Sequence, residues 1–387
     1  MSSSAPLSPQ SPLPGRRPFG SLRDFWQRVS EGRAIDDLWS QFAADAQSSY
    51  GFYGKDVDWE QIDKLPRWKR PFPVIKQFFW ALMNKLTPAR RLLLLVAIAM
   101  LFVSSIKFKL GDQFAFDFNF EFFAALLFLL LLSLELADKV IMKRDLEIAR
   151  EIQSWLVPSD PPSIQGADVA FSTRPQNSVA GDYYDAFYPN LDADSPGKLM
   201  LVMADVAGKS VPAALLMATL QASLHTIASE GFPLSELAKR LNHYASAHSL
   251  DGRRFTTAVI GEYNPSTRHF AYVNAGHNAP ILRCANGHIV RLESGSVPFG
   301  ISPDAAFPSS EIILQPGDTL ILFTDGVVEA FNSSGEEFSD SRWVSIVRAL
   351  PVLPARESLQ YLMKQVDSFV GATRQSDDIT CLVLRCH

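Results

Sequence analysis

The sequence is poor in the residues that build zinc sites and disulfide frameworks. Of its 387 residues only three are cysteines and seven are histidines, and neither type recurs at the spacing of a metal-binding motif. Three cysteines also make no even-numbered framework, which favours a reducing compartment. The sequence therefore predicts neither structural zinc nor a disulfide-stabilised secreted domain.

The chain also has fewer basic than acidic residues, 36 against 41. The formal net charge is −5 at pH 7, which argues against a nucleic-acid partner because proteins of that class present a basic face. No cleavable signal peptide is visible, since the first twenty residues are rich in serine and proline and contain no apolar core. Such a composition buries too little apolar surface to fold, so residues 1–20 are predicted to form a disordered tail.

Apolar residues, by contrast, are abundant and unevenly placed. Hydrophobic residues make up 47% of the chain, and they concentrate in two runs, Leu92–Ile106 and Phe118–Ala137. Extended to Leu110, the first run spans about 28 Å as a helix and the second about 30 Å, close to the roughly 30 Å hydrocarbon core of a bilayer. We therefore predict a two-helix transmembrane hairpin over residues 91–137; the alternative is a pair of buried helices in a soluble core.

Lysine and arginine placement predicts the orientation of this hairpin. Basic residues cluster before the first run and again after the second, whereas the turn between them balances its two lysines with Asp112 and Asp117. By the positive-inside rule both ends of the hairpin face the cytoplasm. The expectation is a multi-pass protein of the cytoplasmic (inner) membrane in which residues 21–90 form a cytoplasmic, juxtamembrane region of unidentified role.

A continuous helix is predicted after the hairpin, because residues Leu134–Trp155 contain neither glycine nor proline. Four of its apolar residues recur at the seven-residue spacing of a coiled-coil seam: Leu134, Ile141, Ile148 and Trp155. The companion positions are poor, with Arg144 or Asp145 where a second apolar residue is wanted. Residues 138–157 are thus either the connecting helix of a parallel homodimer or a single helix packed on the next domain.

The segment 158–387 has a different texture, in which short β-like runs alternate with turn signals and three helical stretches. The β-like runs are Val169–Thr173, Lys198–Ala204, Thr256–Tyr263, His269–Asn274, Ala279–Cys284, Ser309–Leu314, Thr319–Thr324 and Ile379–Leu384. The helical stretches are Val211–Glu230, Pro233–Ala247 and about Ala355–Phe369. Because hairpins connect most of the strands, the pattern predicts an α+β domain rather than a parallel βαβ sheet.

Aspartates follow or precede hydrophobic strands at four places in this domain. They are Asp182 and Asp185 in GDYYDAF, Asp205 in LMLVMADVAGKS, Asp325 in LILFTDGVVEA, and Asp377 and Asp378 in QSDDIT. One such carboxylate is usually a turn or helix cap, but clustered carboxylates raise each other's pKa unless a cation neutralises them. Oxygen ligands suit Mg²⁺ or Mn²⁺, and two such ions together form a hydrolytic site.

Residues from about Leu146 onward resemble the PPM-type metal-dependent protein phosphatases, in the bacterial branch of SpoIIE and RsbU. The matching segments occur in family order: EIAREIQSWLVP, AGDYYDAF, ADVAGKSVPAALLMA, FTTAVIGEYN, YVNAGHNAPILR, GSVPFGI, LQPGDTLILFTDGVVEA and SDDIT. Each is weak alone, whereas the ordered set is specific. The resemblance implies an α-β-β-α sandwich of two antiparallel sheets flanked by helices, with a site for two Mn²⁺ or Mg²⁺ ions at one end.

The resemblance also implies a role for each acidic position. Asp205 resembles the aspartate that bridges both metal ions, and the implied remaining ligands are the carbonyl of Val206 and the side chains of Asp182, Asp325 and Asp377. Supporting positions are Asp185, Asp378, Gly208 and Gly326. Through the metal, Asp205 and Asp325 are expected to activate a water for in-line attack on phosphoserine or phosphothreonine. Ala180 and Ser210 stand where the family often has glycine.

Three further residues have two interpretations each. His277 either touches the active-site region or orders a hairpin turn, Arg174 either binds phosphate or lies solvated on the surface, and Lys209 either serves the acidic site or is an ordinary surface lysine. No substrate-binding residue is named by the sequence. The helix Val211–Glu230 is expected to pack in the core.

Three functions are compatible with these observations. The first is a phosphatase acting on a phosphorylated partner protein, which the resemblance suggests is a STAS-fold anti-sigma-factor antagonist. The second is a non-catalytic, membrane-tethered signalling scaffold, which the presence of every aspartate disfavours. The third is a hydrolase of small phosphate esters, for which the chain lacks a glycine-rich phosphate loop.

Overall fold

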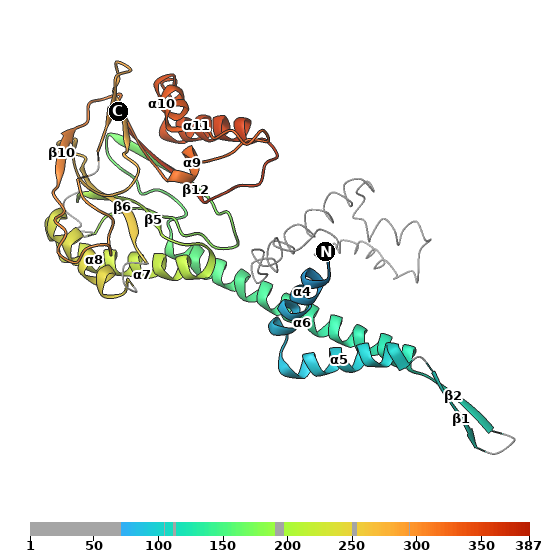
Figure 1. The fold of residues 1–387 in the computed structure, drawn as a ribbon. Coiled ribbons are helices and arrows are strands. Elements are labelled where there is room, and N and C mark those ends of the chain that lie inside the picture. The colour runs from blue at the N-terminus through green and yellow to red at the C-terminus, as the bar shows by residue number, and fades with distance from the viewer. Residues whose placement is uncertain (1–70, 104, 111–113, 190–196, 250–253, 294) are drawn as a thin grey trace, which may run out of the picture. The chain divides into compact units, whose positions relative to one another are not determined.

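The computed structural model describes residues 71–387 except 104, 111–113, 190–196, 250–253 and 294 (Figure 1). The predicted tail and most of the juxtamembrane region lie outside the described residues. Contacts divide the chain into two compact units, Met1–Ala137 and Asp138–His387. We describe each unit by itself.

The first unit contains helices α4 (Pro71–Lys85) and α5 (Pro88–Val103), a hairpin of strands β1 (Ser105–Leu110) and β2 (Phe114–Asn119), and the start of helix α6 (Phe120–Leu156). The prediction of a helical first span reaching Leu110 is therefore wrong. The segment Ser105–Leu110 alternates polar and apolar residues with the period of a strand, and it pairs antiparallel with Phe114–Asn119. At 16 residues, α5 is about 24 Å long.

Two helices of the described residues are long and apolar enough to cross a membrane, α6 with a mean hydropathy of 2.2 and α7 (Ser210–Ala228) with 1.4. Helix α7 belongs to the second unit, where Ala213, Met217 and Leu224 are buried, so its apolar content is explained by core packing as predicted. Of these two helices, only α6 has exposed leucines such as Leu129 and Leu132 and is a candidate membrane span. Length and composition alone are weak evidence for it.

Helix α6 runs without interruption to Leu156, which confirms the continuous helix predicted over Leu134–Trp155. Within the first unit, Arg90 of α5 pairs with Glu135 of α6 at 2.8 Å. Three residues of the heptad seam are exposed: Ile141 by 58%, Ile148 by 45% and Trp155 by 74%. Pairing of this seam with a second chain stays a prediction.

The second unit contains two five-stranded sheets in which every strand pair is antiparallel, which confirms the α+β class. One sheet has the order β10-β7-β6-β5-β4 and the other β3-β12-β11-β8-β9. The strands are β3 (Ala167–Arg174), β4 (Tyr183–Phe187), β5 (Leu199–Val206), β6 (Thr256–Asn264), β7 (His269–Ala275), β8 (Ile281–Arg283), β9 (Ile289–Arg291), β10 (Ser310–Ile313), β11 (Thr319–Phe323) and β12 (Ile379–Cys386).

Helices cover the outer face of each sheet (Figure 1). Helices α7 and α8 (Leu234–Ala247) pack on the first sheet, while α9 (Asp325–Val328), α10 (Asp340–Arg348) and α11 (Ala355–Val370) pack on the second. A third apolar layer joins the two sheets. This arrangement of helix, sheet, sheet and helix layers is the sandwich that the resemblance implied.

The middle strands are buried on both faces, which explains their uninterrupted apolar runs. Along β5, Leu201 and Met203 belong to the layer between the sheets, whereas Met200 and Val202 belong to the layer under the helices. Successive side chains of a strand point to opposite faces, so the position of a residue in the strand decides which layer it enters.

Candidate functional site

Strand alternation brings acidic residues of both sheets to one end of the inter-sheet layer. Tyr184 of β4 and Met203 of β5 belong to that layer, and so Asp182 and Asp205, each two residues away, lie on the same face of their strands. In β12, Leu382 belongs to it too, which places Thr380 and Asp378 on that face of the second sheet.

The carboxylates lie close enough to perturb one another. Burial, then Asp205, raises the pKa of Asp182 well above its ordinary value. The pKa of Asp205 is raised to about 7, mainly by burial and also by the negative charges of Asp325 and Asp377. The pKa of Asp325 is raised mainly by burial and also by the charge of Asp377. The structure thus gathers the acidic positions from both sheets, with Asp378 also raising the pKa of Asp182.

Two threonines of the second sheet hold Asp182, which belongs to the first. The Thr324 and Thr380 hydroxyls donate hydrogen bonds to Oδ2 of Asp182 at 2.8 and 2.5 Å. Asp182 is 4% exposed, so these bonds satisfy a carboxylate that water does not reach. Neither threonine was predicted as a site residue, although each stands inside an acidic motif, in FTDG and SDDIT.

Asp378 acts as a clamp on the loop that carries Asp182. Its Oδ1 accepts a hydrogen bond from the backbone N–H of Gln176, and its Oδ2 accepts one from that of Gly181, both at 2.6 Å. The backbone of Asp378 also requires glycine at position 326, because a Cβ there would lie 1.9 Å from the carbonyl oxygen of Asp378. Gly326 therefore permits the close approach of α9 to the loop of Asp377 and Asp378.

The turn after β5 places Lys209 against the acidic residues. Its Nζ lies 2.8 Å from Oδ2 of Asp377 and donates to the carbonyl of Ser376 at the same distance. The positive charge lowers the pKa of Asp205 and of Asp325, against the upward effect of burial. Lys209 thus serves the acidic site by screening it.

The same turn contains two residues with positive φ. Gly208 has φ +117° and Ser210 has φ +62°. The left-handed region favours glycine and strains a residue with a Cβ. Position 210 is one of the two where the resemblance leads us to expect glycine, and its positive φ is a conformation that glycine adopts without strain.

Asp185 is the acidic position that the structure does not bring to this cluster. It stands three residues from Asp182, an odd number, and so it faces the helix layer. There its Oδ2 accepts a hydrogen bond from Tyr183 at 2.6 Å and lies 2.7 Å from Nε2 of His225 on α7. Asp185 therefore fastens α7 to β4, at a distance from the residues expected to hold metal.

Arg174 and His277, the other two residues with two possible roles, lie in different places: Arg174 is at the surface and His277 is buried. Arg174 forms an ion pair with Asp367 of α11, a partly exposed surface contact. His277 is 5% exposed, and burial lowers its pKa to about 4. Its Nδ1 lies 2.8 Å from Oγ1 of Thr257, and its backbone N–H donates to Oδ1 of Asn274 at 2.9 Å. His277 therefore orders the turn after β7 and also contacts β6, the neighbour of β5.

The cluster fits a divalent cation by charge and by ligand type. Several carboxylates that raise each other's pKa gain stability from a cation between them, and oxygen is the ligand that Mg²⁺ and Mn²⁺ prefer. As arranged, no three histidine, cysteine or carboxylate side chains of the described residues are positioned to hold a metal ion. Which aspartates are the ligands stays a prediction.

The layered fold is that of the PP2C class of domains, with the acidic residues at one end of the sandwich. The solved PP2C domain of SiaA from Pseudomonas aeruginosa has the same fold, with a TM-score of 0.55 at 22% identity, over 65% of this chain and 99% of that one. The family model of the stage II sporulation protein E (SpoIIE) matches residues 195–387. The C-terminal domain of this chain thus belongs to the SpoIIE family of PPM-type phosphatases.

Curated relatives agree with this assignment. The phosphoserine phosphatase RsbU of Bacillus subtilis is 29% identical over 195 residues, covering 50% of this chain and 56% of RsbU. The phosphoserine phosphatase RsbP of the same organism is 27% identical over 196 residues, covering 49% of this chain and 47% of RsbP. The chain spans about half the length of the curated relatives it matches.

Proposed function

We propose that this protein hydrolyses phosphoserine or phosphothreonine on a partner protein, with divalent cations bound at the acidic end of the sandwich. The observation that carries the proposal is the convergence of Asp182 and Asp205 from one sheet with Asp325 and Asp377 from the other, expressed in their mutual effects on pKa. Two relatives that are named phosphoserine phosphatases support it.

In this proposal the cations are Mn²⁺ or Mg²⁺, two in number, and the ligands are Asp182, Asp205, the Val206 carbonyl, Asp325 and Asp377. A divalent cation there supplies positive charge for the phosphoryl oxygens and lowers the pKa of a bound water. The chain's own contribution is preorganisation. Thr324 and Thr380 fix the Asp182 carboxylate, and Asp378 fixes the loop that leads to it.

For the substrate we propose a phosphorylated STAS-fold anti-sigma-factor antagonist, on the strength of the family alone. The competing function is a non-catalytic scaffold at the membrane. The carboxylate cluster disfavours the scaffold, because buried acids with raised pKa values cost folding free energy and serve no purpose in a domain that only binds a partner.

We also propose that α5 and the apolar part of α6 form a hairpin in the cytoplasmic membrane, so that the N-terminus and the phosphatase domain both lie in the cytoplasm. The exposed apolar side chains of both helices support this, as do the basic residues before the first apolar run and after the second. A homodimer through the seam of Ile141 and Ile148 is part of the same proposal, since both side chains are exposed on a single helix.

The test is Mn²⁺-dependent hydrolysis of a phosphoserine peptide by the detergent-solubilised chain. Asp205→Asn and Asp325→Asn should each lower kcat by at least about a hundredfold, in the range lost when an electrostatic catalyst is removed. The exposed Asp304 provides a matched control, and Asp304→Asn should retain full turnover. In a folded parent chain without turnover, the absence of Mn²⁺ binding would favour the scaffold, whereas tight Mn²⁺ binding would point to a requirement for an activator or for dimerisation.

A further inference from the structure

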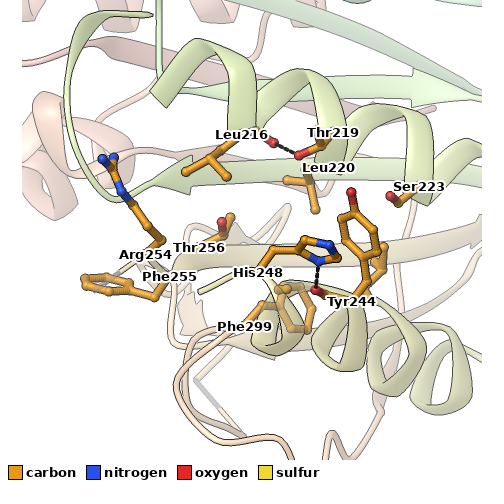
Figure 2. A pocket seen from close by; sticks show the side chains of 12 residues that line it. Leu216, Thr219, Leu220, Ser223, Tyr244, His248, Arg254, Phe255, Thr256 and Phe299 are labelled. Carbon is orange, nitrogen blue, oxygen red and sulfur yellow. Dashed lines mark hydrogen bonds between the residues drawn. The ribbon is translucent and has the colours of Figure 1, made fainter. Parts of the chain in front are cut away.

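A cavity of about 200 Å³ lies between α7, α8 and the start of β6 (Figure 2). Its walls are largely apolar and include Leu220 from α7, Leu241 from α8 and Phe299. Tyr244 and His248 form one end, where the two rings lie 4.5 Å apart. A cavity with apolar walls favours an apolar occupant, because such a group leaves water without losing hydrogen bonds.

The cavity adjoins the proposed active site. Thr256, which lines it, pairs with Val206 across the β5–β6 ladder, next to the pair of Asp205 and Thr257. Arg254 lines the cavity too, and its guanidinium extends away from the cavity in Figure 2. Nη1 of Arg254 would lie 3.3 Å from a Cβ built on Gly208, in the turn that places Lys209 on Asp377.

Arg254 brings a positive charge to this end of the cavity. Its side chain is half-buried and forms no ion pair with any carboxylate among the described residues. An arginine in such a place is well suited to a phosphoryl group, because the guanidinium is always charged and presents a planar set of donors. The guanidinium of Arg254 thus lies between the apolar cavity and the acidic cluster.

We propose that this cavity is a specificity pocket for the phosphoprotein substrate, an inference that rests on the proposed function. It receives an apolar side chain of the substrate close to the phosphorylated residue, while Arg254 pairs with the phosphoryl group. The occupant is defined by two complementary features, an anionic phosphate for Arg254 and an apolar group for the walls of Leu220, Leu241 and Phe299.

The experiment compares phosphoserine peptides that carry leucine or alanine at each flanking position in turn, with p-nitrophenyl phosphate as a reference for the metal site. The wild-type chain should prefer leucine over alanine at one position by about tenfold in kcat/KM, as expected for an apolar pocket. Ser223→Phe fills the cavity and should bring that ratio, normalised to the reference, to about one. Ala222→Phe, on the exposed face of α7, should keep the wild-type ratio.

Two further variants keep the test decisive if Ser223→Phe does not fold. Leu220→Ala enlarges the cavity and should shift the preference from leucine toward phenylalanine. Arg254→Gln should raise KM for p-nitrophenyl phosphate and the peptides alike by about tenfold, in the range of a lost charged hydrogen bond, and Arg254→Lys should recover part of it.

The proposal of a specificity pocket is contradicted if the wild-type chain hydrolyses every peptide without preference, or if the leucine preference survives in both Ser223→Phe and Leu220→Ala. A chain that hydrolyses neither the peptides nor p-nitrophenyl phosphate with Mn²⁺ contradicts the proposed function itself. These outcomes separate failure of the pocket from failure of the catalytic proposal.

Discussion

The side-chain amide of Gln153 forms hydrogen bonds with both backbone polar groups of Ala180. Its Nε2 donates to the Ala180 carbonyl at 2.8 Å, and its Oε1 accepts from the Ala180 N–H at 2.9 Å. Gln153 lies near the end of α6, and Ala180 is two residues before Asp182. The connecting helix is therefore hydrogen-bonded to the loop that carries an acidic residue of the proposed site.

Gln153→Ala removes both of these hydrogen bonds. We expect a loss of about 1–3 kcal/mol in the free energy of unfolding, because two buried backbone groups lose their partner, together with a several-fold weaker affinity for Mn²⁺. Glu151→Ala, an exposed position two residues earlier, is the control. Thermal unfolding and calorimetric Mn²⁺ titration measure the two effects, and an unchanged Mn²⁺ affinity in a destabilised Gln153→Ala would show that the contact serves stability alone.

Ser210→Gly is expected to stabilise the protein. The left-handed φ of Ser210 costs about 1–2 kcal/mol that glycine does not incur, partly offset by the greater freedom of glycine in the unfolded chain. The net gain should be about 1 kcal/mol, a rise of about 2–4 °C in melting temperature for a domain of this size. Ser229→Gly, at a position with φ −65°, should not raise the melting temperature.

Stability of the metal-free protein should depend on pH through the acidic cluster. Burial, then Asp325 and Asp377, raises the pKa of Asp205 from 3.8 to about 7. A carboxyl with a higher pKa in the folded state takes up protons on folding, so its contribution is present below the unfolded pKa and is lost as pH rises to about 7. Melting temperatures in a chelator should fall over this range, and Mn²⁺ or Asp205→Asn should flatten the dependence.

Lys209→Met should tighten Mn²⁺ binding at about pH 8 by several-fold. The cation then no longer displaces an ammonium group from Asp377, and the carboxylates attract it without screening by Lys209. Lys198→Met, which removes a surface ion pair with Glu262, should leave the affinity unchanged. Weaker binding in Lys209→Met would mean that Lys209 instead orients Asp377 for the metal.

Cysteine substitutions at Ile141 and Ile148 test the proposed homodimer. Because these residues are seven apart on one continuous helix, a parallel coiled coil brings each close to its own copy. Oxidation in membranes should cross-link both variants, whereas cysteine at Lys143, on another face of the helix, should cross-link poorly. Failure at both seam positions would leave α6 as a single helix.

Periodicity and turn chemistry predicted most elements of the C-terminal domain. All eight expected strands and three expected helices exist, with ends that differ by a few residues. Strands β4 and β9 and helices α9 and α10 were not predicted, because segments of three to nine residues are too short to show a clear periodicity. In the first unit, the first predicted span is too long, because the alternation of polar and apolar residues in Ser105–Leu110 favours a strand although the segment is apolar on average.

The acidic positions, the order of the motifs and the α+β class were determined by the sequence itself, because residue type, strand alternation and turn signals are local properties. Only the tertiary structure decided that Asp182 faces the inter-sheet layer while Asp185 pairs with His225, since that choice depends on which face of β4 is covered by the second sheet. It also decided that Gln153 and Arg254 adjoin the site. Such contacts join residues far apart in the chain, and packing alone sets their geometry.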